Sequence, residues 1–362
     1  MTRTDRPPLR FHWRLPHGGE TSGATRAAQS RREIGLPDLA AQVDFCRHAE
    51  RCGIDSLLTD FGRAKPDSIL LATALGLATE KIKFIVAYRS GLLAPTSFVQ
   101  QLNTLSALIN GRFSLNIVAG YSPEEQRAYG DFLSHDERYE RTDEFLAVCQ
   151  AFWRGEGKVN FEGKYYRVEN GELNTPFVSS ERRSPEIFIG GSSQAAEELA
   201  VRRGSCWMRL ADTPENLQSS VAPVLAKGVE VGLRLSIISR PTHDEAVSAA
   251  YSMIEGLDDG ERAVEKEREF VRRSDSVSIN STYQLAEKEW LSPQLWAGAV
   301  RSHGAPSIAL VGAPEEIASA FMDYRRIGIS QFILAGWPKL DSMLFFCREI
   351  LPLIREKEND ER

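Results

Sequence analysis

The sequence predicts an α/β protein folded as a (β/α)8 barrel, the TIM barrel, with insertions. Over 362 residues, eight short apolar segments alternate with segments of helical periodicity, and such alternation specifies a parallel sheet with helical crossovers. Eight such units in a chain of this length favour a closed barrel. A doubly wound open sheet is the alternative, because periodicity does not distinguish open from closed parallel sheets.

The predicted strands are short apolar runs. In chain order they are RFHWRL from Arg10, DSLLT from Asp55, KFIVAY from Lys83, FSLNIVA from Phe113, EIFIG from Glu186, CWMRL from Cys206, LRLSII from Leu233 and SQFILA from Ser330. The helical segments between them include residues 39–51, 68–78, 96–109 and 195–203. Strand and helix therefore alternate as a barrel requires.

Three segments interrupt this alternation. GKVNFEGKYYRVENGELNTP, after the fourth helix, has the pattern of a small hairpin. Residues 241–328, between the seventh and eighth strands, are charged and mostly helical and form the largest insertion. Neither segment offers enough apolar alternation for a separate core, so we expect one domain over residues 1–362. The polar stretch 17–35 predicts a long loop at the end of the barrel where active sites lie.

Composition excludes several classes of function. Acidic and basic residues are interspersed, the net charge is -6 and the pI is near 5.7, so no basic block is available for a nucleic acid. Neither a long apolar run nor a secretory signal pattern occurs, so we expect a cytoplasmic protein that does not bind membranes. The five cysteines show no CxxC motif and no Cys/His cluster, which predicts buried thiols and no metal site.

A charged helix is predicted from SHDERYERTDEFLAVCQAFW. Ser134 and Glu137 form a capping box, so the helix begins there and Arg138 and Tyr139 lie in its first turn. The positive end of a helix favours an anion, which makes both side chains candidates for ligand contacts. The alternative is a core tyrosine beside surface arginines, with no ligand.

A second candidate site lies in IFIGGSSQAAEELA. A strand ends in Gly190 and Gly191, and a helix begins at Ser192 and Ser193. Glycines permit close approach of the backbone, and helix-start amides with two hydroxyls suit a phosphate. The alternative is a serine N-cap after a glycine turn.

A third signal is the polar residue inside GRFSLNIVAGYSPEEQ. Asn116 lies in an otherwise apolar strand, so its amide must find hydrogen-bond partners inside the barrel. An amide there suits a planar heterocycle with paired donors and acceptors. Glu125, in the loop that follows, is expected to approach the same ligand. The alternative is a structural asparagine bonded to the neighbouring backbone.

The chain resembles the bacterial-luciferase-like flavin monooxygenases, most closely their alkanesulfonate monooxygenase branch. Five collinear fragments support this: GRFSLNIVAGYSPEE, HDERYER, PEIFIGGSSQAAEELA, LWAGAVRSHG and GISQFILAGWP. The resemblance extends from about Arg10 to Pro352. It implies a TIM barrel, reduced FMN and O2 as cosubstrates, and a separate NAD(P)H-dependent flavin reductase. The FMN contacts that it implies are Asn116, Glu125, Arg138, Tyr139, Gly191, Ser192 and Ser193.

This chemistry makes few demands on the protein. Reduced flavin itself reacts with oxygen, so the protein has to position the ring, exclude water and hold the substrate. No GxGxxG motif of a nicotinamide site occurs, as expected when the reductase is a separate chain.

The residues expected around the substrate depart from the alkanesulfonate branch. Arg234 aligns with an active-site arginine of that branch, but Ser236 stands where the branch has a histidine. Lys65 replaces a cysteine, Trp337 a tyrosine and Leu210 a tryptophan.

A cationic pocket is nevertheless expected. Arg301 or His303 replaces the arginine of the branch's mobile loop, and the sequence RSHGAPS suits a loop that closes over substrate. Together with Arg234 and Lys65, Arg301 favours a small anionic substrate such as a sulfonate or carboxylate. The alternative is that Lys65 and Arg301 are solvated residues of the rim.

The expected activity is therefore a two-component, FMNH2-dependent monooxygenase acting on an alkanesulfonate-like, carbonyl or carboxylate compound. Two alternatives stay open: a deazaflavin-dependent oxidoreductase on the same barrel, and a catalytically silent flavin-binding protein. A homodimer or homotetramer is expected.

Overall fold

The computed structural model describes residues 7–16, 37–63, 65–256 and 261–361. Eight parallel strands form a ring in the order β1 (Arg10–Arg14), β2 (Ser56–Thr59), β3 (Lys83–Tyr88), β4 (Phe113–Val118), β7 (Ile187–Gly190), β8 (Cys206–Leu210), β9 (Glu230–Ser239) and β12 (Ile329–Gly336). The ring closes because β9 pairs with both β8 and β12, and β12 pairs with β1. The predicted (β/α)8 barrel is confirmed, and an open sheet is excluded.

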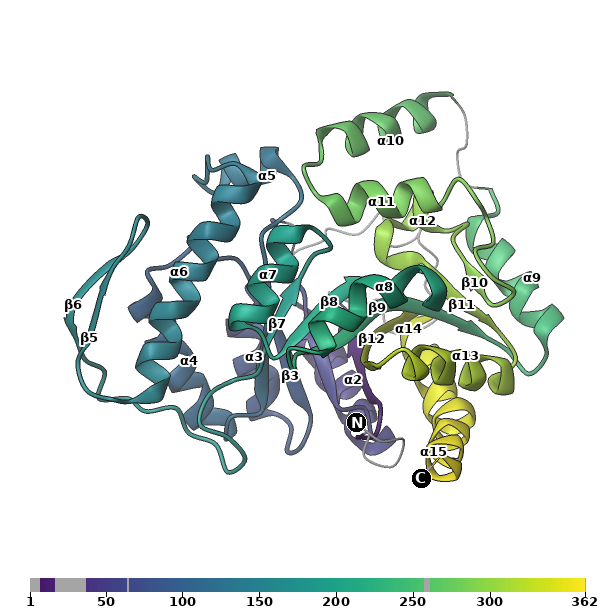
Figure 1. The fold of residues 1–362 in the computed structure, drawn as a ribbon. Coiled ribbons are helices and arrows are strands. Elements are labelled where there is room, and N and C mark those ends of the chain that lie inside the picture. The colour runs from purple at the N-terminus through teal and green to yellow at the C-terminus, as the bar shows by residue number, and fades with distance from the viewer. Residues whose placement is uncertain (1–6, 17–36, 64, 257–260, 362) are drawn as a thin grey trace.

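Helices cover the outside of the ring (Figure 1). They include α2 (Leu39–Cys52), α3 (Ser68–Leu77), α4 (Pro95–Ile109), α6 (His135–Arg154), α7 (Gln194–Arg203), α8 (Pro214–Leu225), α13 (Pro314–Arg326) and α14 (Lys339–Phe345). The short α5 (Pro123–Ala128) lies in the connection from β4 to α6, and α15 (Leu351–Asp360) follows at the C-terminal end of the chain. Local signals set their ends. Asp38 caps α2 by accepting a hydrogen bond from the Ala41 amide, and Gly53 ends the helix with φ +80°. The predicted capping box of α6 is present.

Of the two smaller predicted interruptions, the structure describes only the hairpin. The hairpin after α6 is confirmed: β5 (Val159–Glu162) and β6 (Arg167–Gly171) pair in antiparallel fashion, and Figure 1 shows them projecting beside α6. The predicted loop 17–35 lies outside the described residues.

The large insertion lies between β9 and β12, as predicted, but it is not only helical. Its helices are α9 (His243–Ile254), α10 (Glu261–Arg273), α11 (Val277–Leu285) and the short α12 (Val300–His303). It also contains β10 (Leu295–Trp296) and β11 (Ala309–Gly312), and β11 pairs in parallel with the last part of β9. Figure 1 shows α10 and α11 together at one end of the molecule.

The pairing of β9 with β11 explains why β11 was missed. β9 is ten residues long, so residues 236–239 extend beyond the segment that pairs with β8 and offer an edge to β11. A small apolar cluster packs there, with Trp296, Ala309 and Ile238 among its buried members. The four-residue run of β11 is too short for its periodicity to reveal this partner.

A buried polar layer lies inside the N-terminal half of the barrel. His12 of β1 is hydrogen-bonded to Gln331 at 3.0 Å and to Ser56 at 2.6 Å. Burial is the main cause that lowers the pKa of His12. The hydrogen-bond partners of His12 therefore lie in the core of the barrel, and we assign this histidine a structural role.

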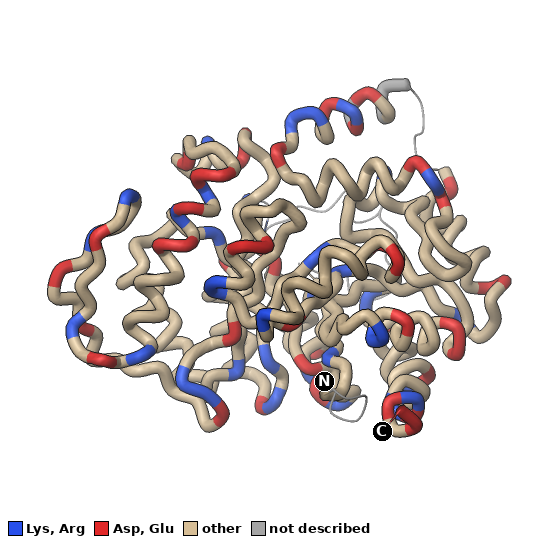
Figure 2. The backbone as a smooth tube through the Cα atoms, viewed as in Figure 1, with Lys and Arg blue, Asp and Glu red and all other residues tan. Residues whose placement is uncertain are grey.

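The surface carries both charges. Figure 2 shows Lys and Arg interspersed with Asp and Glu along the outer helices, without a continuous basic face in this view. Among the described residues, no helix combines the length and apolarity needed to cross a bilayer.

Candidate active site

A cavity of about 420 Å³ lies at the C-terminal ends of the barrel strands. The ends of β3, β4, β7, β8, β9 and β12 contribute to its wall. The insertion adds Phe270 and residues 276–279 and 303–307 to the same wall. The segment between β9 and β12 thus covers the end of the barrel at which TIM-barrel enzymes hold their active sites.

Most residues singled out from the sequence meet at this cavity. They are Lys65, Asn116, Tyr139, Gly191, Ser192, Ser193, Arg234, Ser236 and Trp337. Leu210 and His303 also line it, whereas Glu125, Arg138 and Arg301 do not. The structure therefore brings the first set together around one hollow.

The Asn116 amide faces the cavity from the interior strand β4. The residue is 7% exposed, and its Oδ1 is buried without a hydrogen bond from any described residue. An unsatisfied buried acceptor costs about 1–3 kcal/mol. The structural alternative, an amide oxygen bonded to neighbouring backbone, is not observed. The position suits a ligand that donates a hydrogen bond.

The turn between β7 and α7 approaches Tyr139 closely. Gly191 has φ +138°, and a Cβ there would lie 2.5 Å from the Tyr139 hydroxyl, so only glycine leaves room for the ring. The hydroxyl donates a hydrogen bond to the Gly190 carbonyl at 3.3 Å. Burial raises the pKa of Tyr139 to about 12, so the phenol keeps its proton at neutral pH.

The two serines of this turn have structural partners as well as places on the wall. Ser193 is the N-cap of α7 and accepts a hydrogen bond from the Ala196 amide at 3.2 Å. Ser192 Oγ accepts a hydrogen bond from Ser278 Oγ of α11 at 3.0 Å. The serine N-cap considered as an alternative is therefore present. The helix start still favours an anion at this end of the cavity.

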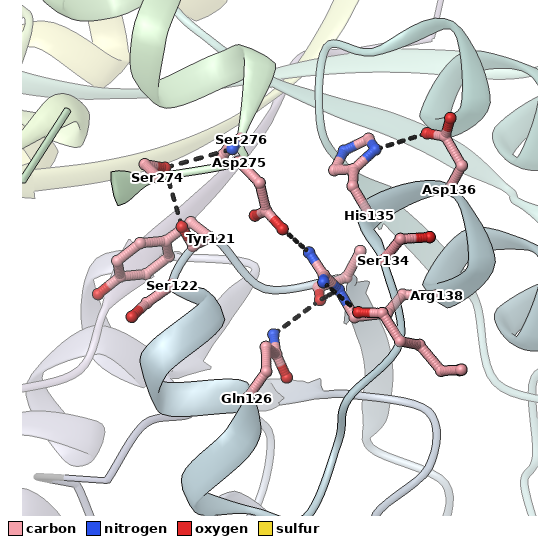
Figure 3. A network of polar contacts seen from close by, with 12 residues as sticks. Tyr121, Ser122, Gln126, Ser134, His135, Asp136, Arg138, Ser274, Asp275 and Ser276 are labelled. Atoms are coloured by element: carbon pink, nitrogen blue, oxygen red, sulfur yellow. Dashed lines mark hydrogen bonds and ion pairs between the residues drawn. The ribbon is translucent and has the colours of Figure 1, made fainter. Parts of the chain in front are cut away.

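Arg138 is buried behind the wall. Its guanidinium donates to the carbonyls of Ala119 (2.9 Å) and Leu133 (3.0 Å) and to the carboxylate of Asp275 (2.7 Å). Figure 3 shows Asp275 reaching down from the insertion to this group. Arg138 therefore joins α6 to the linker between α10 and α11 and does not line the cavity.

A second hydrogen bond reinforces this junction. Ser274 Oγ donates to the Tyr121 carbonyl at 2.8 Å, as drawn in Figure 3. The Tyr121 ring contacts Phe270 of α10, with 6.1 Å between ring centroids. We call residues 274–276 the hinge linker. Because Phe270 and residues 276–279 line the cavity, these bonds hold its cover in place.

The other two residues off the wall also have partners. Glu125 accepts a hydrogen bond from Arg89 at 2.6 Å. Arg301 is half exposed and lies 3.4 Å from Glu267. His303, the other candidate for this position, lines the cavity and contacts the Trp337 ring with 5.4 Å between centroids.

Three cations surround one buried carboxylate on the cavity wall. Asp60 Oδ2 lies 2.7 Å from Arg14 Nε and 3.1 Å from Lys65 Nζ, and Asp60 Oδ1 lies 3.3 Å from Arg234. We call Arg14, Asp60, Lys65 and Arg234 the Asp60 cluster. Burial is the main cause that lowers the pKa values of Lys65 and Arg234.

Sequence reasoning found only part of this cluster. Lys65 and Arg234 were predicted, whereas Arg14 and Asp60 were not. Each of the missed residues stands at or just beyond the C-terminal end of a barrel strand, β1 and β2. A charged residue at that position is a recognisable signal in this fold.

A buried lysine beside this cluster predicts a pH dependence. Burial, followed by the charge of Arg14, lowers the pKa of Lys339 to about 6. In the unfolded chain the value is about 10.4, so the unfolded state binds more protons between these values. Above the unfolded-state pKa, Lys339 does not reduce the free energy of unfolding. As the pH falls towards the folded-state pKa, the free energy of unfolding decreases.

We therefore expect the Tm of Lys339→Met, relative to that of the wild type, to rise as the pH falls from about 10 towards 6. Thermal unfolding of both proteins in a series of buffers checks this. A Tm difference that is constant with pH would contradict the stated cause.

The fold is that of the TIM-barrel enzymes, and the cavity lies at the end of the barrel where those enzymes hold their active sites. The family model of the luciferase-like monooxygenases matches residues 9–331. The chain belongs to this family of oxidoreductases.

Solved structures agree with the fold. The EDTA monooxygenase of Chelativorans sp. BNC1 superposes with a TM-score of 0.76 at 20% identity, covering 97% of this chain and 94% of that one. A long-chain alkane monooxygenase gives 0.71 at 18% identity, covering 98% and 92%. An F420-dependent secondary alcohol dehydrogenase gives 0.66 at 18% identity, covering 96% and 100%.

Proposed function

We propose that this protein is a two-component monooxygenase that uses reduced FMN and O2 to oxygenate a small anionic organic substrate. A separate NAD(P)H-dependent flavin reductase would supply the reduced flavin in the cytoplasm. The observation that supports this most directly is Asn116 Oδ1 on the cavity wall, which accepts no hydrogen bond from any described residue.

The residues present fit a flavin. Asn116 would accept a hydrogen bond from the ring system, and the Ser192–Ser193 turn with Tyr139 would hold the phosphate at the start of α7. The flavin, when bound, supplies the reaction with oxygen. The protein's own part is to orient the ring and to exclude water beneath the insertion.

The substrate would bind on the other side of the cavity. Lys65 and Arg234 provide positive charge there, and Trp337 with His303 provides an aromatic wall. Ser236 donates its hydroxyl to the Pro306 carbonyl at 3.1 Å, so we assign it a structural role in positioning the 303–307 segment. Arg301 would act only if the insertion moved.

The test is product formation from labelled oxygen. The protein is incubated with FMN, a flavin reductase, NADH, and a panel of sulfonates, carboxylates and ketones in ¹⁸O2, and products are identified by mass spectrometry. We expect one labelled oxygen atom in the product of at least one anionic substrate. Oxygen uptake that is independent of every substrate class would count against the proposal.

A deazaflavin-dependent oxidoreductase is the second candidate, because an F420-dependent dehydrogenase shares this fold. Anaerobic spectral titration distinguishes the two functions. Tight binding of reduced F420 with substrate reduction and no oxygen uptake would replace the monooxygenase proposal.

We also propose a homo-oligomer that covers an exposed apolar face of α3. Leu70 and Leu77, seven positions apart on this helix, are 72% and 61% exposed. Sedimentation equilibrium should show a dimer or tetramer for the wild type and a monomer for the double variant Leu70→Glu, Leu77→Glu. Phe132→Glu, at an exposed loop position, should leave the assembly intact. A monomeric wild type would contradict this proposal.

A further inference from the structure

The Asp60 cluster carries more positive charge than its own carboxylate balances. Three cationic side chains lie within 3.3 Å of Asp60, which is 5% exposed. With one negative charge among them, the net charge is about +2 if all four groups are ionised. The guanidinium and ammonium groups are held on one carboxylate, so this excess is compact.

Within the described part of the chain, the neighbouring groups do not balance this positive charge. Among the described residues that line the cavity, Asp60 is the only carboxylate, while Arg209 adds a further cation. Glu125 lies nearby but accepts a hydrogen bond from Arg89. Lys339 lies close enough to Arg14 for that charge to help lower its pKa. Among the described residues that line the cavity, cations therefore outnumber the one carboxylate.

Burial makes this arrangement costly without a ligand. Arg234 and Lys65 are only 25% and 27% exposed, and like charges at close range repel more strongly where water is scarce. A singly charged ligand would leave one positive charge uncompensated. A ligand with two negative charges close together would balance the cluster and add hydrogen bonds to both planar guanidinium groups.

We propose that the Asp60 cluster recognises a doubly charged organic acid, so that the preferred substrate is a compact dianion such as a dicarboxylate, a sulfocarboxylate or a phosphonate. This rests on the proposed function only in assigning the anion to the substrate. Asp60 has a positioning role: it holds the three cations around one carboxylate and offsets part of their mutual repulsion.

Binding of matched anions to the flavin-free protein tests the proposal. Butyrate and succinate, and propanesulfonate and 3-sulfopropionate, are compared by isothermal titration at constant ionic strength. One additional charge-assisted contact predicts that each dianion binds about 10- to 100-fold more tightly than its partner. Equal affinities within each pair would overturn the proposal.

Charge-removing variants locate the effect. Lys65→Gln should remove most of the preference for the dianion, and Arg14→Gln provides the same test if the first variant is unstable. Arg209→Gln removes a cation from the same cavity, but its guanidinium lies over the Trp207 ring and donates to Ser220. It should keep the preference. Loss of preference in Arg209→Gln alone would overturn the assignment to the Asp60 cluster.

The Asp60 cluster could instead bind the phosphate of the cofactor. A further titration distinguishes this phosphate from a substrate dianion. FMN and riboflavin are titrated against wild type and Lys65→Gln. We expect Lys65→Gln to bind both flavins as tightly as the wild type does. If Lys65→Gln weakens FMN alone, the cluster holds the cofactor and the substrate assignment is wrong. None of these measurements uses oxygen turnover, so their failure is distinct from failure of the monooxygenase proposal.

Discussion

Replacing Asp275 by alanine is expected to destabilise the protein by about 2–4 kcal/mol and to release the cover of the cavity first. Arg138 is 2% exposed, and among the described residues the Asp275 carboxylate is its only anionic partner. Removing it leaves a buried charge facing two carbonyls. Because Asp275 itself is 26% exposed, the lower half of this range is the better expectation.

The location of the damage is the sharper part of this prediction. The hinge linker joins α10 to α11, so hydrogen exchange should accelerate over residues 270–280 before the barrel strands respond. Flavin binding should weaken in parallel, since residues 276–279 line the cavity. The matched control is Asp136→Ala, which removes an 84% exposed carboxylate close by on α6. If Asp275→Ala and Asp136→Ala had the same effect on hydrogen exchange and flavin binding, a role of the Arg138–Asp275 pair would be refuted.

The barrel could be predicted from the sequence because its information is local. Each ring strand is a short apolar run, and the alternation with helices appears within windows of about 10–20 residues. β11 could not be found in this way. Its place depends on the extended end of β9, which lies about 70 residues earlier in the chain.

The same distinction between local and long-range information applies to the residues of the candidate site. Asn116, Gly191 and Ser193 belong to strand ends and a helix start, so local pattern and family resemblance are enough to single them out, and they lie on the cavity wall. Arg138 has an equally clear position in the first turn of α6, but its side chain turns to a partner 137 positions away. A first-turn arginine suits a ligand or a carboxylate equally well, and only the folded insertion decides between them.

The Asp60 cluster could not be predicted as a whole, because its members are far apart in the sequence. Its ion pairs join Arg14 to Asp60 over 46 positions and Arg234 to Asp60 over 174. No spacing rule links such residues. Barrel closure does, because it brings the C-terminal ends of β1, β2 and β9 to one rim.

Replacing Asn116 by leucine is expected to separate stability from function. In the wild type the buried Oδ1 has no hydrogen-bond partner among the described residues, so an apolar side chain of similar size removes a desolvation cost. We expect the flavin-free variant to be more stable by about 1 kcal/mol. Its affinity for FMN should fall at least about tenfold, since a ligand donor would then meet a methyl group.

Asn103 supplies the matched control for this experiment. It is also a buried asparagine, but its amide nitrogen donates to the Thr175 carbonyl and its oxygen accepts from Trp153 Nε1 at 3.0 Å. Asn103→Leu leaves these partners unsatisfied and should therefore destabilise the protein without a specific loss of flavin affinity. Thermal unfolding and flavin titration of both variants give the comparison. If Asn116→Leu lost stability as Asn103→Leu does and still bound FMN normally, Asn116 would be a structural residue, because an amide kept for a ligand is a cost to the empty fold.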